Sequence, residues 1–361
     1  MRQTTTGGIT LDYPDALVMA YNPVMFHIAS GIEAMKISLT ANGKTYAMTA
    51  DAIDGEAWAD TQQYIQVLFS PQVTGEVDYN NLDGASTTFM AVTGSIEAVI
   101  DENTSVTFSV AFSAVWGALS TQPNDAFNGF RRVTWFRNYP FSFGAYIPSG
   151  STSIQVGTNS VNINAEGIYD FVPIDNGSDV MPVIDLGGVV QQGVFDGTFD
   201  ITFMAISGGG NPNRLGTIDI DREHNEGIYL RWIDRHGFTA YWLFKVGDEQ
   251  HTITQIIAAS RANYAAYRER YGFTGNAGER GACSRADVVP LCVPLVDKTT
   301  WEYLQDVASS PVVDMFAGMD PNNDPIWVEV SVQAATYTKT RDELQDFTIN
   351  LLPPQTPVQR L

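Results

Sequence analysis

Residues 227–247 read GIYLRWIDRHGFTAYWLFKVG, and both halves of this stretch alternate with a period of two. On the first half, one face carries Ile228, Leu230 and Trp232, and the other carries Tyr229, Arg231 and Ile233. On the second half, one face carries Phe238, Ala240, Trp242 and Phe244, and the other carries Thr239, Tyr241, Leu243 and Lys245. Alternation of β-branched and aromatic residues is typical of strands, so the stretch predicts a β-hairpin.

The two strands of this hairpin are joined by Asp234-Arg235-His236-Gly237. Asp favours the first position of a tight turn, and Gly can adopt the positive φ that closes it. Large apolar side chains occur on both faces of the hairpin. We therefore expect it to lie inside a sheet, with a packed layer on each side.

Strand patterns separated by turn residues recur along the rest of the chain. The clearest is 106–116, in which apolar residues face one side and mostly Thr and Ser face the other. Strands are also expected over 24–28, 35–40, 44–48, 64–69, 87–100, 288–296, 311–316, 327–334 and 344–352. Short, regularly spaced strands predict an all-β protein with two β-sandwich or barrel-like domains. One or two short helices are expected in the C-terminal half, one of them over 300–308 and capped by Asp297-Lys298-Thr299-Thr300.

The length of 361 residues favours two domains, and the small-residue stretch at 148–153 is the expected boundary. The first domain is predicted over 1–148 and begins with an extended N-terminal arm. The second is predicted over 149–361 and contains an Arg- and Tyr-rich insertion at 258–285.

The composition excludes several classes of partner. The formal net charge is −21, and so negative a surface repels nucleic acid and anionic lipid. Hydrophobic residues make up 44% and charged residues 17%, which is enough to bury a sizeable core. The start of the chain has no secretory signal pattern, and no run of 18 apolar residues occurs. We expect synthesis in the host cytoplasm, no membrane insertion and no direct contact with nucleic acid; delivery outside the cell as part of a particle stays open.

The insertion at 258–285 concentrates arginine in an acidic chain. It can be a solvated loop, or an arm that docks on an acidic face of a neighbouring copy, because Arg and Tyr are enriched at interfaces. Residues 258–271 could form a short helix with an aromatic stripe. The residues expected at a subunit interface are Arg261, Tyr264, Tyr267, Arg268, Arg270, Tyr271, Arg280 and Arg285.

Patterns that would indicate catalysis are weak. Asp219 and Asp221 would point the same way on a strand, as a metal site requires, but the run also fits an ordinary acidic turn. Residues 320–325 lack the Gly and the terminal Glu of a calcium loop and predict a turn. Two cysteines, Cys283 in a loop and Cys292 on a strand, are too few for a zinc site, and a disulfide between them stays open. Nucleophile-elbow, P-loop and zinc-protease motifs do not occur. We therefore predict no catalytic residues, no cofactor and no metal.

Exposed aromatic residues could instead bind sugars. The candidates are Trp58, Trp135 and Trp301. Most Trp residues in a strand-rich chain belong to the core, so the same residues can equally be structural.

Several short stretches resemble a tail structural protein family of bacteriophages and prophages that infect Bacteroidetes. They are AYNPV at 20–24, WG at 116–117, RRVTWF at 131–136, YPF at 139–141, YLRW at 229–232, YWLF at 241–244, LCVPLVD at 291–297, WEYL at 301–304, SPVV at 310–313 and LQDF at 344–347. The resemblance implies a place in the virion tail or baseplate and transfers no catalytic residues.

The combined prediction is a non-enzymatic structural subunit of a bacteriophage tail, in a distal tail or baseplate ring. Such a ring closes through head-to-tail contacts between copies of one chain, and further contacts are expected with other tail or baseplate proteins. The alternative is a carbohydrate- or receptor-binding module at the phage tip or on a bacterial surface. A metal-dependent glycan hydrolase that uses Asp219 and Asp221 is a third possibility.

Overall fold

The computed structural model of the chain describes residues 1–29, 31–69, 77, 79, 84–119, 130–148, 152–156, 159–163, 165–172, 174–175, 182–183, 198–205, 213–255, 258–260, 278–280, 283–322 and 324–353. Within these residues the fold is all-β, as predicted. The helices in this part are α1 (Gln62–Leu68) and α3 (Lys298–Ser309).

The N-terminal region packs two sheets against each other. The first has the order β1 (Arg2–Thr6), β2 (Ile9–Tyr13), β4 (Met25–Ile28) and β7 (Ala57–Asp60). The second has the order β3 (Leu17–Met19), β10 (Thr104–Val115), β9 (Phe89–Asp101), β5 (Ala34–Ala41) and β6 (Lys44–Asp51). Phe26 and Phe112 meet between the sheets with ring centroids 6.3 Å apart. Alternating buried and exposed residues on β9 and β10 confirm the half-buried strand expected over 106–116.

The middle of the chain, together with the short strand Gly84–Ala85, forms three further sheets. One has the order β11 (Arg131–Phe136), β19 (Asn213–Asp221), β18 (Thr198–Ala205), β13 (Thr152–Val156) and β14 (Asn159–Ile163). Another has the order β12 (Phe143–Ile147), β15 (Gly167–Phe171) and β8 (Gly84–Ala85), and the third pairs β16 (Ile174–Asp175) with β17 (Pro182–Val183). Val133 of β11 and Ile218 of β19 share one hydrophobic core. Most members of the N-terminal hydrophobic cluster come from residues 9–116, and most members of this second cluster come from residues 133–243.

The predicted hairpin is β20 (Ile228–Ile233) paired with β21 (Thr239–Val246). Leu230, Trp232 and Phe244 pack into one hydrophobic cluster, together with α3. Tyr229, Tyr241 and Leu243 pack into another, together with β11 and β12. The hairpin therefore has a packed layer on each face, as its sequence predicts.

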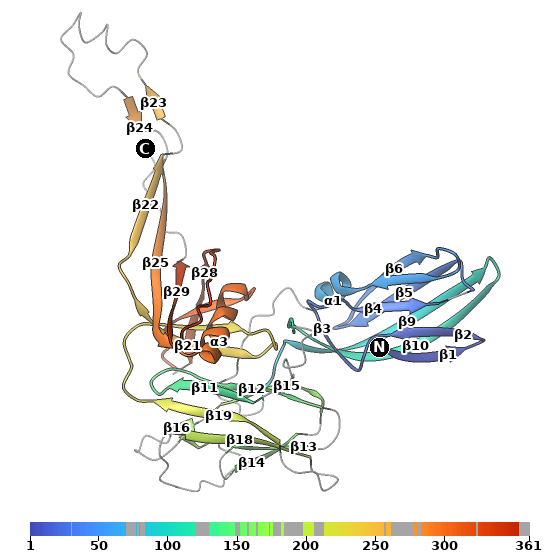
Figure 1. Ribbon diagram of the computed structural model, residues 1–361, viewed down its shortest axis with the longest axis horizontal. Coiled ribbons are helices and arrows are strands. Elements are labelled where there is room, and N and C mark those ends of the chain that lie inside the picture. Colours follow the sequence, from blue (N-terminus) through green and yellow to red (C-terminus); the bar gives the residue numbers. More distant parts are fainter. Residues whose placement is uncertain are drawn as a thin grey trace, which may run out of the picture.

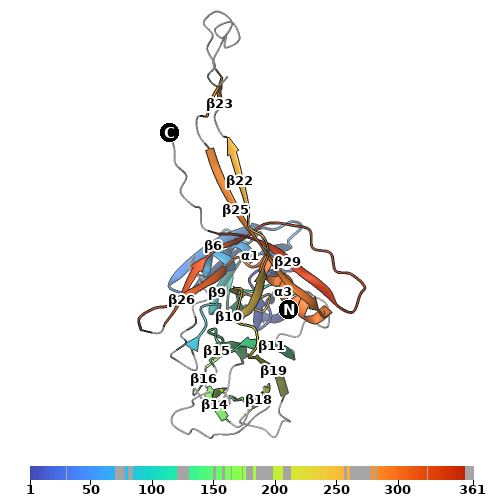
Figure 2. The same cartoon turned by 90° about the vertical axis from the view of Figure 1, so that its left-hand side faces the viewer.

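The hairpin belongs to an eight-stranded sheet, and one part of that sheet leaves the body of the molecule. The order is β27 (Pro325–Glu329), β26 (Val313–Met319), β20, β21, β25 (Cys283–Val296), β29 (Gln345–Leu352) and β28 (Ser331–Val332), with β22 (Gln250–Gln255) paired to β25 off this path. Figures 1 and 2 show β22 and the first half of β25 projecting as a narrow ribbon, with β23 (Ala258–Ser260) and β24 (Gly278–Arg280) beyond them.

Two local predictions are wrong, and the start of one possible helix is excluded. Residues 64–68 lie in α1 rather than in a strand. Ile65 and Leu68, three positions apart, are buried while Val67 is half exposed, which is helical spacing. Residues 258–260 form β23, so the helix considered there does not begin at Ala258. Cys283 begins β25 rather than lying in a loop, and Cys292 lies nine positions further along the same extended strand, about 30 Å away. Because a disulfide needs Cα atoms within about 7 Å, these two cysteines are not bonded to each other.

The C-terminal helix follows its sequence signals. The Asp297 side chain accepts a hydrogen bond from the Thr300 backbone N–H at 2.7 Å and so caps the start of α3. Trp301, Leu304 and Val307 form the buried face of the helix.

Candidate functional site

The turn of the central hairpin is held by one buried carboxylate. Asp234 Oδ1 accepts hydrogen bonds from the backbone N–H groups of His236 at 2.8 Å and Phe238 at 2.9 Å. Its Oδ2 lies 3.2 Å from His236 Nδ1. Burial alone would raise the pKa of Asp234, but His236, Arg131 and the backbone N–H of Phe238 together lower it below its ordinary value. Asp234 is therefore ionised and fixes the turn, while Gly237 adopts a φ of +77° as expected.

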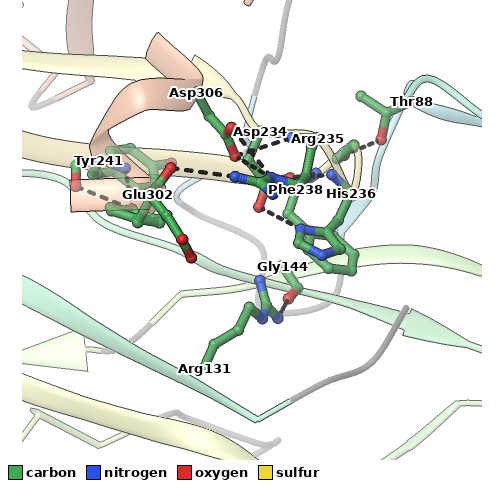
Figure 3. Close-up of polar contacts among 12 residues, drawn as sticks. Thr88, Arg131, Gly144, Asp234, Arg235, His236, Phe238, Tyr241, Glu302 and Asp306 are labelled. Carbon is green, nitrogen blue, oxygen red and sulfur yellow. Dashed lines mark hydrogen bonds and ion pairs between the residues drawn. The ribbon is translucent and has the colours of Figure 1, made fainter. Parts of the chain in front are cut away.

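The same turn docks against the N-terminal region (Figure 3). The backbone N–H of Ala118 donates to the Arg235 carbonyl at 2.8 Å. The Thr88 hydroxyl donates to the Gly237 carbonyl at 2.7 Å and is itself fully buried. These bonds join segments more than 110 residues apart in the sequence, so the turn fixes the N-terminal region to the C-terminal sheet.

Arg235 extends this junction to helix α3. Its Nε donates to the Asp306 carboxylate at 3.1 and 3.2 Å, and its Nη2 donates to the Glu302 carbonyl at 3.3 Å (Figure 3). Burial raises the pKa of Asp306 above its ordinary value, although the hydrogen bond from Arg235 opposes the shift. The pair is partly shielded from water, because 31% of the Arg235 side chain and 12% of the Asp306 side chain are exposed.

Arg131 connects the turn to the middle sheets. Its guanidinium lies between two rings, 4.3 Å from the centroid of Phe143 and 4.2 Å from that of Phe238, and it donates to the Gly144 carbonyl. A cation between two aromatic faces is stabilised by both ring quadrupoles. The N-terminal, middle and C-terminal parts of the chain thus all meet at residues 234–238.

A cavity of about 400 Å³ opens beside this junction. It is lined by Tyr21, Trp116, Gly117, Ala118, Ile233, Asp234, Arg235, Asp306, Ser309, Ser310 and Pro311. The two carboxylates in its wall are engaged by the backbone N–H groups of the turn and by Arg235. The polar groups at the junction therefore stabilise the turn and its neighbours.

A second buried polar network lies under the hairpin. The Ser142 hydroxyl donates to Asp170 Oδ1 at 3.1 Å and lies 2.9 Å from the Tyr241 hydroxyl. The Tyr241 hydroxyl also lies 2.9 Å from that of Tyr79. Burial raises the pKa of Asp170 to about 6 and that of Tyr79 to about 12. Asp170 thus loses its proton near neutral pH rather than near pH 4.

This network gives a testable pH dependence. The folded chain holds the Asp170 proton up to about pH 6 while the unfolded chain releases it near 3.8, so this group stabilises the fold most below pH 3.8. That contribution declines as the pH rises towards 6. Asn does not titrate, so we expect Asp170→Asn to gain about 3 kcal/mol of unfolding free energy relative to the native chain between pH 4 and pH 8. Urea denaturation at both pH values measures this. The control is Asp248→Asn at an exposed position. A difference for Asp170→Asn that changes no more between the two pH values than that of the control would contradict the assignment.

Most of the predicted interface residues lie outside the described residues. These are Arg261, Tyr264, Tyr267, Arg268, Arg270 and Tyr271. Arg280 lies on β24, opposite Ala258 of β23. Arg285 lies on β25, opposite Ile253 of β22. The structure thus places these two residues on the projecting ribbon and its continuation.

The acidic pair on β19 has structural partners. Asp219 forms an ion pair with Arg132 on the neighbouring strand β11. Asp221 accepts hydrogen bonds from the backbone N–H groups of Glu223 and His224 and from the His224 ring. In the described part of the chain, no three His, Cys, Asp or Glu side chains gather as a metal site would need. Of the two interpretations of this acidic stretch, these contacts favour an ordinary turn that follows a strand.

The three candidate tryptophans differ sharply in exposure. Trp135 and Trp301 are each 4% exposed and belong to hydrophobic cores, so neither can stack on a sugar. Trp58 on β7 is 53% exposed.

The predicted turn at 320–325 is also confirmed, since Asp320 Oδ1 accepts hydrogen bonds from the backbone N–H groups of Asn322 and Asp324.

None of the helices in the described ranges is long and apolar enough to cross a membrane.

Comparison with known proteins identifies no family. No protein-family model matches the chain, and no curated protein matches it. Among solved structures, the periplasmic chaperone SfaE is 8% identical with a TM-score of 0.18, and the match covers 59% of this chain and all of that one. The Salmonella enterica SafA pilin in complex with the SafB chaperone is 13% identical with a TM-score of 0.19, covering 58% and 97%. Scores this low support no argument about this chain.

Proposed function

We propose that the chain is a non-enzymatic structural subunit of a bacteriophage tail, a distal tail or baseplate component that assembles into a ring. The ring would form through contacts between copies of the chain and would bind other tail or baseplate proteins. The observation that carries this proposal is the projecting ribbon.

We do not expect a ribbon of only two strands to be stable without a further partner. Residues 283–288 of β25 pair with residues 250–255 of β22, and in the described part of the chain neither strand has another partner at these positions. Two-stranded hairpins are marginally stable in water, and their outer edges present unpaired backbone N–H and C=O groups. A neighbouring copy that pairs with or packs on the ribbon would satisfy both needs.

The distribution of charge indicates which surface of a neighbouring copy the ribbon would bind. Residues 258–285 hold five arginines against two glutamates, a net charge of +3, which leaves −24 for the rest of the chain. A basic extension on an acidic body is attracted to the body of the next copy. Contact between two different patches is the head-to-tail arrangement from which closed rings are built.

The test removes the end of the ribbon without disturbing its base. Gln255 and Cys283 are paired, so replacing residues 256–282 with Asn-Gly closes β22 and β25 through a two-residue turn. We expect the native chain to form rings and the shortened chain to remain a folded monomer. Light scattering, negative-stain electron microscopy and circular dichroism measure mass, shape and folding.

A charge-only variant separates attraction from shape. It keeps the full length and changes Arg261, Arg268, Arg270, Arg280 and Arg285 to Gln. We expect it to assemble less than the native chain at low salt, where electrostatic attraction is strongest. At high salt, screening already weakens the attraction between native chains, so the difference should be smaller. Rings from the shortened chain, or a native chain that stays monomeric at every concentration, would refute the proposed function.

A further inference from the structure

Trp58 is held in one orientation although half of it faces solvent. Its ring stacks on His27 of the neighbouring strand β4, with centroids 3.6 Å apart and an interplanar angle of 15°. Its Nε1 donates to Glu56 Oε1 at 2.7 Å. The exposed fraction is 53%, so the ring face opposite His27 is open to a ligand.

His27 is fixed in turn, which makes the stack rigid. Its Nδ1 lies 2.9 Å from Asp12 Oδ2, and its Nε2 lies 2.9 Å from Glu56 Oε1. Asp12, His27 and Trp58 are direct cross-strand neighbours on β2, β4 and β7. A single row across the sheet thus supports the indole, and only 9% of His27 is exposed. Binding to a ring already held in place loses little conformational entropy.

Carboxylates flank the indole along the edge strand. Glu56, Trp58 and Asp60 alternate with the buried Ala57 and Ala59, so the three project from one face at spacings of about 7 Å. Hydrogen bonds from Trp58 and His27 lower the pKa of Glu56, which keeps it ionised. Asp60 Oδ1 is held by the backbone N–H groups of Val24 and Gln62 at 3.0 Å. The site therefore offers a flat apolar face between two hydrogen-bond acceptors.

We infer that Trp58, with Glu56 and Asp60, is a binding site for a neutral sugar ring of a surface glycan. The apolar C–H face of a pyranose stacks on an indole, and its hydroxyl groups donate to carboxylates on either side. Sugars that carry a carboxylate or sulfate would be repelled by Asp12, Glu56 and Asp60. This site would give a tail subunit a contact with the host surface, which is beyond the proposed role in ring assembly.

Glycan binding tests the inference directly. Purified native chain is applied to immobilised neutral trisaccharides of glucose, galactose, mannose and N-acetylglucosamine, with uronic-acid trisaccharides for comparison. We expect binding to at least one neutral sugar and none to the acidic ones. Trp58→Ala should weaken that binding at least tenfold, whereas Trp58→Phe, which keeps a smaller ring face, should retain part of it. Phe130→Ala is the matched control, because Phe130 is 58% exposed elsewhere and its loss should change nothing.

Three results would overturn the inference. They are no binding by the native chain, equal binding by Trp58→Ala, or preference for acidic sugars. Light scattering of the same variants separates this site from the assembly surface. If Trp58→Ala loses the oligomeric state of the native chain and no sugar binds, Trp58 is a subunit contact. If the shortened-ribbon chain is monomeric yet still binds sugar, the two surfaces are independent, as we expect.

Discussion

Asp314→Ala is expected to lower the free energy of unfolding by about 3–5 kcal/mol, since it leaves a buried guanidinium without its carboxylate. Arg231 on β20 and Asp314 on β26 are direct cross-strand neighbours, and Arg231 Nε donates to Asp314 Oδ2 at 2.8 Å. Only 7% and 11% of the two side chains are exposed. The Arg231 guanidinium also lies 4.4 Å from the centroid of the Trp327 ring.

Burial alone would lower the pKa of Arg231, but the nearby Tyr79, Tyr241 and Asp314 raise it. The guanidinium thus stays charged in the core. Without Asp314 its desolvation is no longer offset by the carboxylate, and the Trp327 ring compensates for only part of the loss.

The matched control removes both charges at once. Arg231→Met with Asp314→Leu removes both members of the ion pair, so it should lose less stability than Asp314→Ala, which leaves the guanidinium buried without its carboxylate. Urea denaturation followed by near-ultraviolet circular dichroism measures all three proteins. A loss below 1 kcal/mol for Asp314→Ala, or a larger loss for the double variant, would contradict this account of the pair.

The sequence predicted the parts of the fold that local chemistry decides. The alternation in 227–247 indicated strands packed on both faces, and Asp234 and Gly237 fixed where they turn. Asp297 likewise marked the start of α3. Each of these signals acts between residues close in the chain, so it can be read without knowledge of tertiary contacts.

Contacts between distant residues could not be predicted in the same way. Asp306 gave no sign that it would pair with Arg235, because the partners are 71 residues apart and meet only when α3 packs beside the hairpin turn. Tyr64 and Val67 suggested a strand, and only the burial of Ile65 and Leu68 made the helix the better arrangement. In both cases tertiary packing decided the outcome.

The candidate sites likewise depend partly on residues close in the sequence and partly on tertiary contacts. Trp58 was one of three equivalent tryptophans in the sequence, and only the pairing of β4 with β7 places it on His27. The arginines of residues 258–285 could be identified as a basic concentration. The place of Arg285 on the projecting ribbon follows from the long pairing of β22 with β25, which the sequence of this stretch does not reveal.

Gly227→Ala should be nearly as damaging as the loss of Asp314, at about 4 kcal/mol. Gly227 opens the central hairpin with a φ of +150°, a conformation that residues with a Cβ rarely adopt. A Cβ atom built there would lie 2.2 Å from the Phe244 carbonyl oxygen, which belongs to the partner strand and cannot move without breaking the pairing. Strained backbone contributes about 1–3 kcal/mol and overpacking about as much again.

Gly247, which directly follows the second strand of the same hairpin, is the matched control. Its added Cβ would meet the Pro290 carbonyl oxygen at 3.3 Å, a contact that a shift of a few tenths of an ångström relieves. We expect Gly247→Ala to change the free energy of unfolding by less than 1 kcal/mol. Because Leu230, Trp232 and Phe244 pack on one face of the hairpin and Tyr229 and Tyr241 on the other, Gly227→Ala should disturb both cores together. Near-ultraviolet circular dichroism should then show a broad loss of aromatic signal, and equal stabilities for the two alanine variants would mean that the close approach at Gly227 does not constrain the hairpin.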